Sequence, residues 1–497
     1  MELHSYRAEA EAFIAELSRE YYEHYAGLED DFAIEPIYER HAGLFSREAV
    51  DELRELAERD GGSADDRRRL RTLLEFGVDG HLGLATKSID AELARTEAGL
   101  TLDVDGESLG YRESAVVQAN EPDRDRRARI EEARLQAVAE SLNPLTRESL
   151  EQAHALARDL GWASYRTMFE ELKGIDLEGL ARQTAGFIEA TEEAYGPILE
   201  PELQRTVGVG LDDLRRSDLP WFFRDREADG LFPADRLVES FQQTMAGLGI
   251  DVAAQANVTL DVEKRPKKSP RAFCAPVRVP EEVYLVVPPM GGRDDYVALF
   301  HEGGHTEHFA GVDPALPFEF RHLGDNSVTE GFAFLFDHLV EDPEWLRRRL
   351  GVDDDAGLAA HAVAHRLVFL RRYAAKLAYE LELHEAVRPL EDMAPVYAAR
   401  LSHAVRCPWP ETTYLTDVDP GFYAANYLRA WSLETHLRAT LRNRFGPAWF
   451  DEPRAGDFLR GLWRDGQRLD ADELVAEVAG AELDFSAMLE DLGLKAG

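Results

Sequence analysis

Two histidines and a glutamate make the stretch 301–305 the part of this chain best suited to chemistry. His301 and His305 lie four residues apart, with Glu302 between them. On a helix, positions i and i+4 share one face, so both imidazoles can bind one metal ion. The Glu302 carboxylate lies one position further round, where it can take a proton from a metal-bound water. The pattern predicts half of a zinc hydrolase site, and a third ligand must come from elsewhere.

The first candidate for the third ligand is a glutamate 25 residues after His305. Glu330 lies in the first turn of a helix predicted over about 325–339. Its carboxylate would complete a set of two histidines and one glutamate, with a fourth position open for water. The same glutamate also matches the capping box Ser327-x-x-Glu330, which would need no metal. Both interpretations of Glu330 stay open at this point.

Other polar side chains near these two segments are candidates for supporting roles. His308 and His322 compete with Glu330 as the third ligand. His308 follows the second motif histidine by three residues, which suits a group that orients a ligand or contacts substrate. Asp325 and Asp337 are candidate hydrogen-bond acceptors for the metal-binding imidazoles.

The elements that must position these residues can be predicted from the local sequence. Residues 288–292 contain two prolines and two glycines and break the chain, and Asp294 or Asp295 can cap a new helix. We expect that helix over about 294–310, with the motif inside it. The two adjacent glycines of the motif each cost about 1 kcal/mol against alanine in a helix. They therefore indicate that another backbone or a substrate comes close there.

The rest of the chain has mainly helical periodicity, so we expect a mainly α fold. Strand signals gather at 258–262 and 271–287, immediately before the predicted metal-binding helix. The chain has no linker-like stretch and no clear repeat. We therefore expect a single domain over 1–497 with a helical N-terminal lobe (1–250) and a metal-bearing catalytic lobe (251–497). The N-terminal helices are predicted at 5–27, 47–59, 64–100, 122–141, 146–159, 162–172, 176–206 and 234–248.

A small sheet beside the metal-binding helix would have a use in binding. An exposed edge strand around Ala272, Phe273 and Cys274 can pair with an extended peptide through backbone hydrogen bonds, whatever the side chains of that peptide. The alternative is that these strands only pack under the helix.

Composition limits the partners and the compartment. The net charge of −39 argues against a nucleic-acid partner, because phosphates would be repelled. Two cysteines, Cys274 and Cys407, do not make a disulfide framework. We see no apolar run long enough to cross a membrane and no leader at Met1, so we expect no membrane partner and a cytoplasmic location.

The motif region resembles a known family. Residues 301–308 followed by Glu330 are similar to the thimet oligopeptidase and oligoendopeptidase family, which are gluzincins with the neurolysin-like fold. Both the interval to the glutamate and the extra His308 match. The resemblance extends upstream to 268–275 and 283–288, and downstream to 421–432, a segment rich in Gly and Tyr that ends in Trp-Ser. The matching part covers about 265–435.

The resemblance implies a two-lobed helical zincin whose central channel admits short peptides, with one Zn²⁺ per chain. It implies that Glu302 is the general base, and that Tyr427 or Tyr423 donates a hydroxyl to the oxyanion of the tetrahedral intermediate. Ordinary half-buried helix residues are the alternative for these two tyrosines. Asn426 and Arg429 stand where thimet-type enzymes have further tyrosines.

Three function classes follow for this chain. The first is an oligoendopeptidase that cleaves internal bonds of short peptides, with His308, Ala272 and Phe273 contacting the substrate. The second is a zinc carboxypeptidase of related fold, in which Arg429 or Arg271 binds the substrate's terminal carboxylate. The third is a catalytically idle homologue that keeps the metal.

Overall fold

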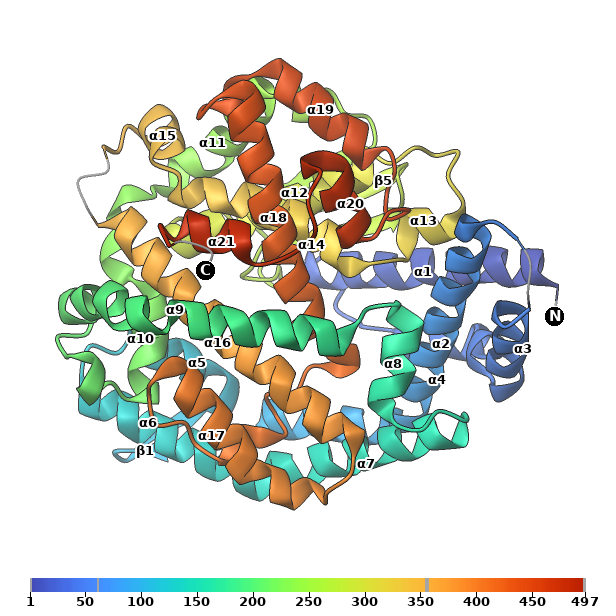
Figure 1. Ribbon diagram of the computed structural model, residues 1–497, viewed down its shortest axis with the longest axis horizontal. Helices are drawn as coiled ribbons and strands as arrows, with labels where there is room; N and C mark the ends of the chain where they lie inside the picture. The colour runs from blue at the N-terminus through green and yellow to red at the C-terminus, as the bar shows by residue number, and fades with distance from the viewer. Residues whose placement is uncertain (1, 60–61, 354–356, 495–497) are drawn as a thin grey trace. The chain divides into compact units, whose positions relative to one another are not determined.

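Helices dominate the computed structural model, which describes residues 2–59, 62–353 and 357–494 (Figure 1). The mainly α prediction is confirmed. Among the described residues, no helix has the length and apolar composition needed to span a membrane.

Contacts divide the chain into two compact units, each assembled from separate segments. Unit 1 consists of Met1–Gly80, Glu227–Ala359 and Arg429–Met488, and unit 2 consists of His81–Arg226, Ala360–Leu428 and Leu489–Gly497. The units are interleaved along the chain, so neither coincides with the predicted lobes 1–250 and 251–497. The predicted metal-binding residues all belong to unit 1.

Unit 1 combines helices with a three-stranded sheet of order β3-β5-β4. Strand β3 (Val258–Asp261) runs parallel to the central β5 (Glu282–Val286), and β4 (Phe273–Arg278) runs antiparallel to it. The predicted strand region 271–287 is therefore two strands and a turn. The helices of unit 1 are α1 (Leu3–Tyr25), α2 (Ile34–Arg40), α3 (Arg47–Ala57), α11 (Ala234–Gly247), α12 (Arg293–Ala310), α13 (Phe318–His322), α14 (Asn326–Asp337), α15 (Pro343–Trp345), α19 (Pro453–Trp463) and α20 (Ala471–Ala479).

The described part of unit 2 is helical apart from a hairpin of β1 (Thr101–Val104) and β2 (Glu107–Gly110). Helices α4 (Ala64–Gly99), α16 (Leu358–Glu385), α18 (Tyr423–Phe445) and α21 (Ser486–Asp491) contain residues of both units. Its other helices are α5 (Tyr111–Asn120), α6 (Arg124–Ala137), α7 (Asn143–Asp159), α8 (Tyr165–Lys173), α9 (Leu177–Thr206), α10 (Leu219–Arg224) and α17 (Ala394–Val405).

Helix α12 carries the histidine motif, and its N-terminus is capped in a way that the sequence did not predict. The N-cap is Gly292 at φ 93°, a conformation that favours glycine, and Asp229 from a distant segment accepts the Arg293 N–H at 3.1 Å. Asp294 and Asp295 lie in the first turn, so the prediction that one of them is the N-cap was wrong. Asp295 instead accepts the Gly291 N–H at 2.8 Å and fixes the loop before the helix.

The two motif glycines lie where α12 meets its neighbours. A Cβ on Gly304 would lie 2.7 Å from Ala333 Cα and 2.8 Å from Phe332 O, both on α14. A Cβ on Gly303 would lie 2.3 Å from the Phe241 ring of α11. Close approach was expected at these glycines, and the α14 backbone approaches Gly304 while the Phe241 ring approaches Gly303. The crossing at Gly304 brings α14 against the histidine-bearing part of α12.

Candidate metal centre

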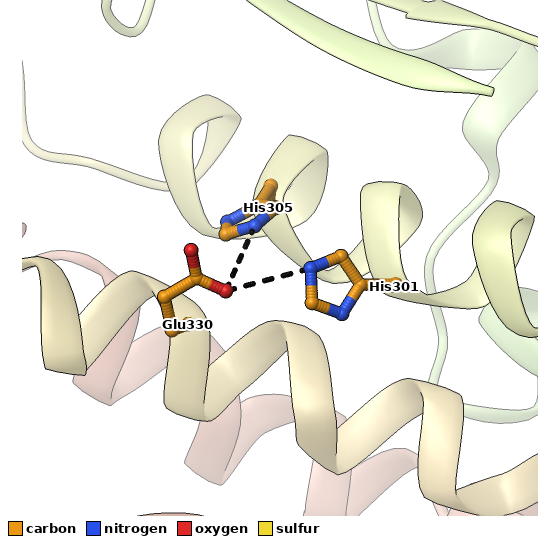
Figure 2. A group of neighbouring side chains, drawn as sticks. All are labelled: His301, His305 and Glu330. Atoms are coloured by element: carbon orange, nitrogen blue, oxygen red, sulfur yellow. Dashed lines mark ion pairs between the residues drawn. The ribbon is translucent and has the colours of Figure 1, made fainter. Parts of the chain in front are cut away.

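His301, His305 and Glu330 meet between α12 and α14 (Figure 2). Glu330 Oε2 lies 3.5 Å from His301 Nε2 and 3.7 Å from His305 Nε2, and one candidate ligand atom from each residue lies within 4.8 Å of the others. Ligand atoms around a tetrahedral zinc with bonds of 2.0–2.2 Å are about 3.3–3.6 Å apart. The spacing fits an ion between the three groups, and it is longer than a good hydrogen bond.

No second group of three His, Cys, Asp or Glu side chains with comparable spacing occurs among residues 2–59, 62–353 and 357–494. The chemistry of the donors also fits zinc, which binds imidazole nitrogen and carboxylate oxygen. These residues could therefore hold a zinc ion with one coordination position left for water or substrate.

The other nitrogen of each imidazole is held by α14. His301 Nδ1 lies 2.9 Å from Asp337 Oδ2, and His305 Nδ1 lies 2.8 Å from Thr329 Oγ1. A hydrogen bond at Nδ1 fixes the ring and leaves Nε2 for a metal. Asp337 was among the predicted acceptors. Thr329 was missed, although its position directly before Glu330 could have indicated it.

The two imidazoles differ in their tendency to carry a proton. Burial lowers the pKa of His305 to about 3, so its ring is neutral at pH 7. Burial also acts to lower the pKa of His301, but the hydrogen bond with Asp337 and the nearby Glu330 carboxylate outweigh it and raise that pKa to about 10. Burial raises the pKa of Asp337 itself to about 6. A cation at the centre would therefore compete with a proton on His301.

Glu302 lies against the first residues of β4. Its Oε2 accepts the backbone N–H of Cys274 at 2.9 Å, so this N–H points away from the β5 partner strand. Burial raises the pKa of the Glu302 carboxyl, with the nearby Glu330 adding to the effect. A carboxylate with a raised pKa beside three candidate ligands is well suited to accept a proton.

Glu330 is not a helix cap. Helix α14 begins at Asn326, and its N-cap is Asp325, whose side chain accepts the Ser327 N–H at 2.9 Å. Glu330 therefore lies beyond the N3 position, where a capping-box glutamate would be. The capping interpretation was wrong, and the carboxylate faces the two histidines instead.

Arg429 stabilises the start of α14. It is buried and donates to Asp325 at 2.5 Å, to Ser327 Oγ at 3.0 Å and to Asp472. Burial opposes ionisation of Asp325, but the charge of Arg429 outweighs it and lowers the pKa of that carboxyl to about 2. The guanidinium is engaged by two carboxylates, so the prediction that it binds substrate is not supported. Asp325 likewise serves the helix rather than a ligand imidazole.

His308 and His322 do not join the cluster. His308 is fully buried, its Nε2 lies 3.2 Å from the Gly466 carbonyl oxygen, and its ring packs against Phe332. A fully buried ring is not available to a substrate, so the predicted substrate contact of His308 is corrected to a packing role. His322 Nε2 accepts the Val279 N–H at 3.3 Å in the turn between β4 and β5.

The remaining predicted residues have no tested role. Phe273 is the first residue of β4 and Ala272 directly precedes it; both are half-buried, and Arg271 is exposed. Tyr423 and Tyr427 belong to unit 2, with ring centroids 4.9 Å apart on α18. The proposed hydroxyl donation by the two tyrosines stays a prediction.

Comparison with known protein families and curated sequences found no match. No protein-family model matches the chain, and no curated protein sequence matches it. The resemblance to the oligopeptidase family therefore rests on the motif residues of the sequence alone.

Proposed function

We propose that this protein is a zinc-dependent peptidase that hydrolyses internal bonds of short peptides, with His301, His305 and Glu330 as the metal ligands. The observation that carries the proposal is the convergence of the two Nε2 atoms and one carboxylate oxygen within 4.8 Å. A zinc ion bound there would polarise a scissile carbonyl and lower the pKa of a bound water toward neutrality. The expected neurolysin-like two-lobed fold belongs to this proposal.

Glu302 moves the protons in this proposal. Its burial raises the pKa, which makes the carboxylate a stronger base than an exposed glutamate. The Cys274 N–H holds Oε2, so the side chain has a fixed position when it takes a proton from the attacking water. The carboxylic acid formed in that step then donates the proton to the departing amine.

Strand β4 supports a peptide as the substrate. It lies at an edge of the described three-stranded sheet, with β5 on one side, and its Cys274 N–H contacts the base. An extended peptide beside such an edge can hydrogen-bond to the strand backbone. The substrate's scissile bond would then lie close to the carboxylate that β4 positions.

The endopeptidase proposal is favoured over the carboxypeptidase alternative by the environment of Arg429. Its two carboxylate partners leave it no role with a terminal carboxylate, whereas Arg271 is exposed and stays a candidate for that role. An idle homologue with a structural zinc would be expected to offer four protein ligands, whereas this cluster has three.

Digestion of short peptides tests the proposed function. Blocked peptides of five to ten residues, amidated at the C-terminus, are incubated with protein that has been depleted of metal and then loaded with zinc. We expect internal cuts, read by mass spectrometry, that disappear on chelation and return with zinc. A second set of the same peptides has free C-termini. Stepwise loss of single residues from this set, with no cleavage of the blocked set, would instead establish a carboxypeptidase. No cleavage of either set would overturn the proposal.

A further inference from the structure

One face of α14 carries an aromatic ring among the residues of the metal centre. Glu330, Phe334 and Asp337 lie at positions i, i+4 and i+7 and therefore share this face. The Phe334 ring centroid lies 5.2 Å from that of His301. The ring therefore lies beside His301, on the same helix face as Asp337, which hydrogen-bonds the His301 Nδ1.

Phe334 differs in its surroundings from the phenylalanines on the other faces of the helix. Phe332 and Phe336 are fully buried in the core of unit 1, whereas Phe334 is half-buried. Trp431, which is also half-buried, stacks on it with centroids 5.3 Å apart and ring planes at 24°. The pair therefore presents a partly exposed apolar surface, with Phe334 beside His301.

The stacked pair is held by close contact between α14 and α18. A Cβ on Gly331 would lie 2.6 Å from Leu433 Cδ2, so only glycine lets the two helices approach this closely without a shift of Leu433. Next to Trp431, the Ser432 hydroxyl donates to the Asp484 carbonyl oxygen at 2.5 Å. The surface is therefore part of a rigid contact, which favours binding because little side-chain freedom is lost.

We propose that Phe334 and Trp431 form a subsite for a large apolar side chain, preferably aromatic, on the residue next to the bond that is cleaved. This inference rests on the proposed function and assigns a substrate class to it. A partly exposed pair of aromatic rings can bind a further apolar side chain through burial of apolar surface, and an aromatic one also through ring contacts. An apolar pocket commonly discriminates by roughly 10- to 200-fold between side chains of different size.

The competing explanation is that Phe334 only packs against His301. Such a role would alter metal affinity when Phe334 is changed, and it would leave the preference among peptides as it was. Peptide preference and zinc affinity therefore separate the two explanations.

Binding to the zinc-loaded Glu302→Gln protein tests the subsite independently of turnover. One alanine-rich hexapeptide and a series with a single Phe moved through its positions are titrated by calorimetry. We expect one Phe position to bind at least roughly tenfold more tightly than the all-Ala peptide. Phe334→Leu and Trp431→Leu, each combined with Glu302→Gln, should remove most of this gain and leave zinc affinity unchanged. Phe445→Leu, fourteen residues further along α18, is the matched control and should keep the preference.

Equal binding of all the peptides would overturn the subsite, and so would a preference that survives both leucine substitutions. The proposed function is tested apart from this, since it fails if the zinc-loaded wild-type protein cleaves no peptide. A preference in binding would then still show that Phe334 and Trp431 bind an aromatic side chain, but no cleaved bond would lie beside it.

Discussion

At the scale of single residues, the candidate metal centre depends on hydrogen bonds that fix its two imidazoles. Asp337 and Thr329, both on α14, each hold one Nδ1 atom, at 2.9 and 2.8 Å. Because the same helix supplies Glu330, one element both completes the candidate ligand set and orients the two imidazoles. Loss of either hydrogen bond should therefore lower the affinity for the metal.

Replacing Asp337 tests this dependence. Asp337→Ala should weaken zinc binding by roughly 10- to 100-fold, because the His301 ring loses the partner that fixes its orientation. Zinc affinity is measured by competition with a chromophoric chelator. Asp294→Asn, an exposed change on α12, is the control and should bind zinc like the wild type. Unchanged zinc affinity in Asp337→Ala would show that the hydrogen bond does not support the centre.

At the scale of elements, the crossing of α12 and α14 brings the three candidate ligands together. Helical spacing predicted both helices, and the 25-residue interval predicted Glu330 as a ligand. The start of α12 could not be predicted in the same way, because Asp229, which accepts the Arg293 N–H, is 64 residues away in sequence. The burial of Arg429 was also missed, since its partners Asp325 and Asp472 come from distant segments.

A methyl group at the crossing should separate the helices. Gly304→Ala places a Cβ at 2.7 Å from Ala333 Cα, so we expect a loss of about 1–3 kcal/mol in the free energy of unfolding, together with weaker zinc binding. Gly461→Ala is the control, because Gly461 is exposed on α19 and a Cβ there meets nothing within 4 Å. It should raise stability by up to about 1 kcal/mol. Urea denaturation measures both, and equal stability of the two variants would contradict the close packing.

At the scale of the whole molecule, composition and periodicity predicted a mainly α protein and could not predict its division into units. The segments 1–80, 227–359 and 429–488 come together in unit 1 through contacts between residues far apart in sequence. The local sequence pattern shows which face of a helix is apolar. It does not show which of the other helices packs against that face. The predicted lobes 1–250 and 251–497 are each one continuous stretch of sequence. The units defined by contacts are each assembled from three separate segments.

Buried histidines make the stability of unit 2 depend on pH. His154 Nε2 lies 2.9 Å from His384 Nδ1, and burial lowers the pKa of His154 to about 4, with a further lowering from Arg158. Burial also lowers the pKa of His384. An unfolded histidine has a pKa of about 6.5 and takes up a proton more readily than the folded one. The stability due to His154 is therefore fully present above pH 6.5 and is lost as the pH falls toward 4.

The variant His154→Gln isolates this effect. Between pH 8 and pH 5 the wild type should lose about 2 kcal/mol of unfolding free energy through His154, and the variant should not. The difference in stability between the two proteins, measured by urea denaturation in the presence of chelator, should therefore shrink as the pH is lowered. A difference that stays constant from pH 8 to pH 5 would show that His154 does not have a depressed pKa.

The central claim is that Glu302 is the base of a zinc-dependent hydrolysis, and one substitution tests it most directly. Glu302→Gln keeps the size of the side chain and removes its ability to accept a proton, while the three candidate ligands stay unchanged. Zinc content and peptide cleavage are measured on the same preparation. We predict about one zinc per chain with cleavage reduced by roughly 10²- to 10⁴-fold or more. Cleavage at the wild-type rate by the zinc-loaded variant would contradict the account.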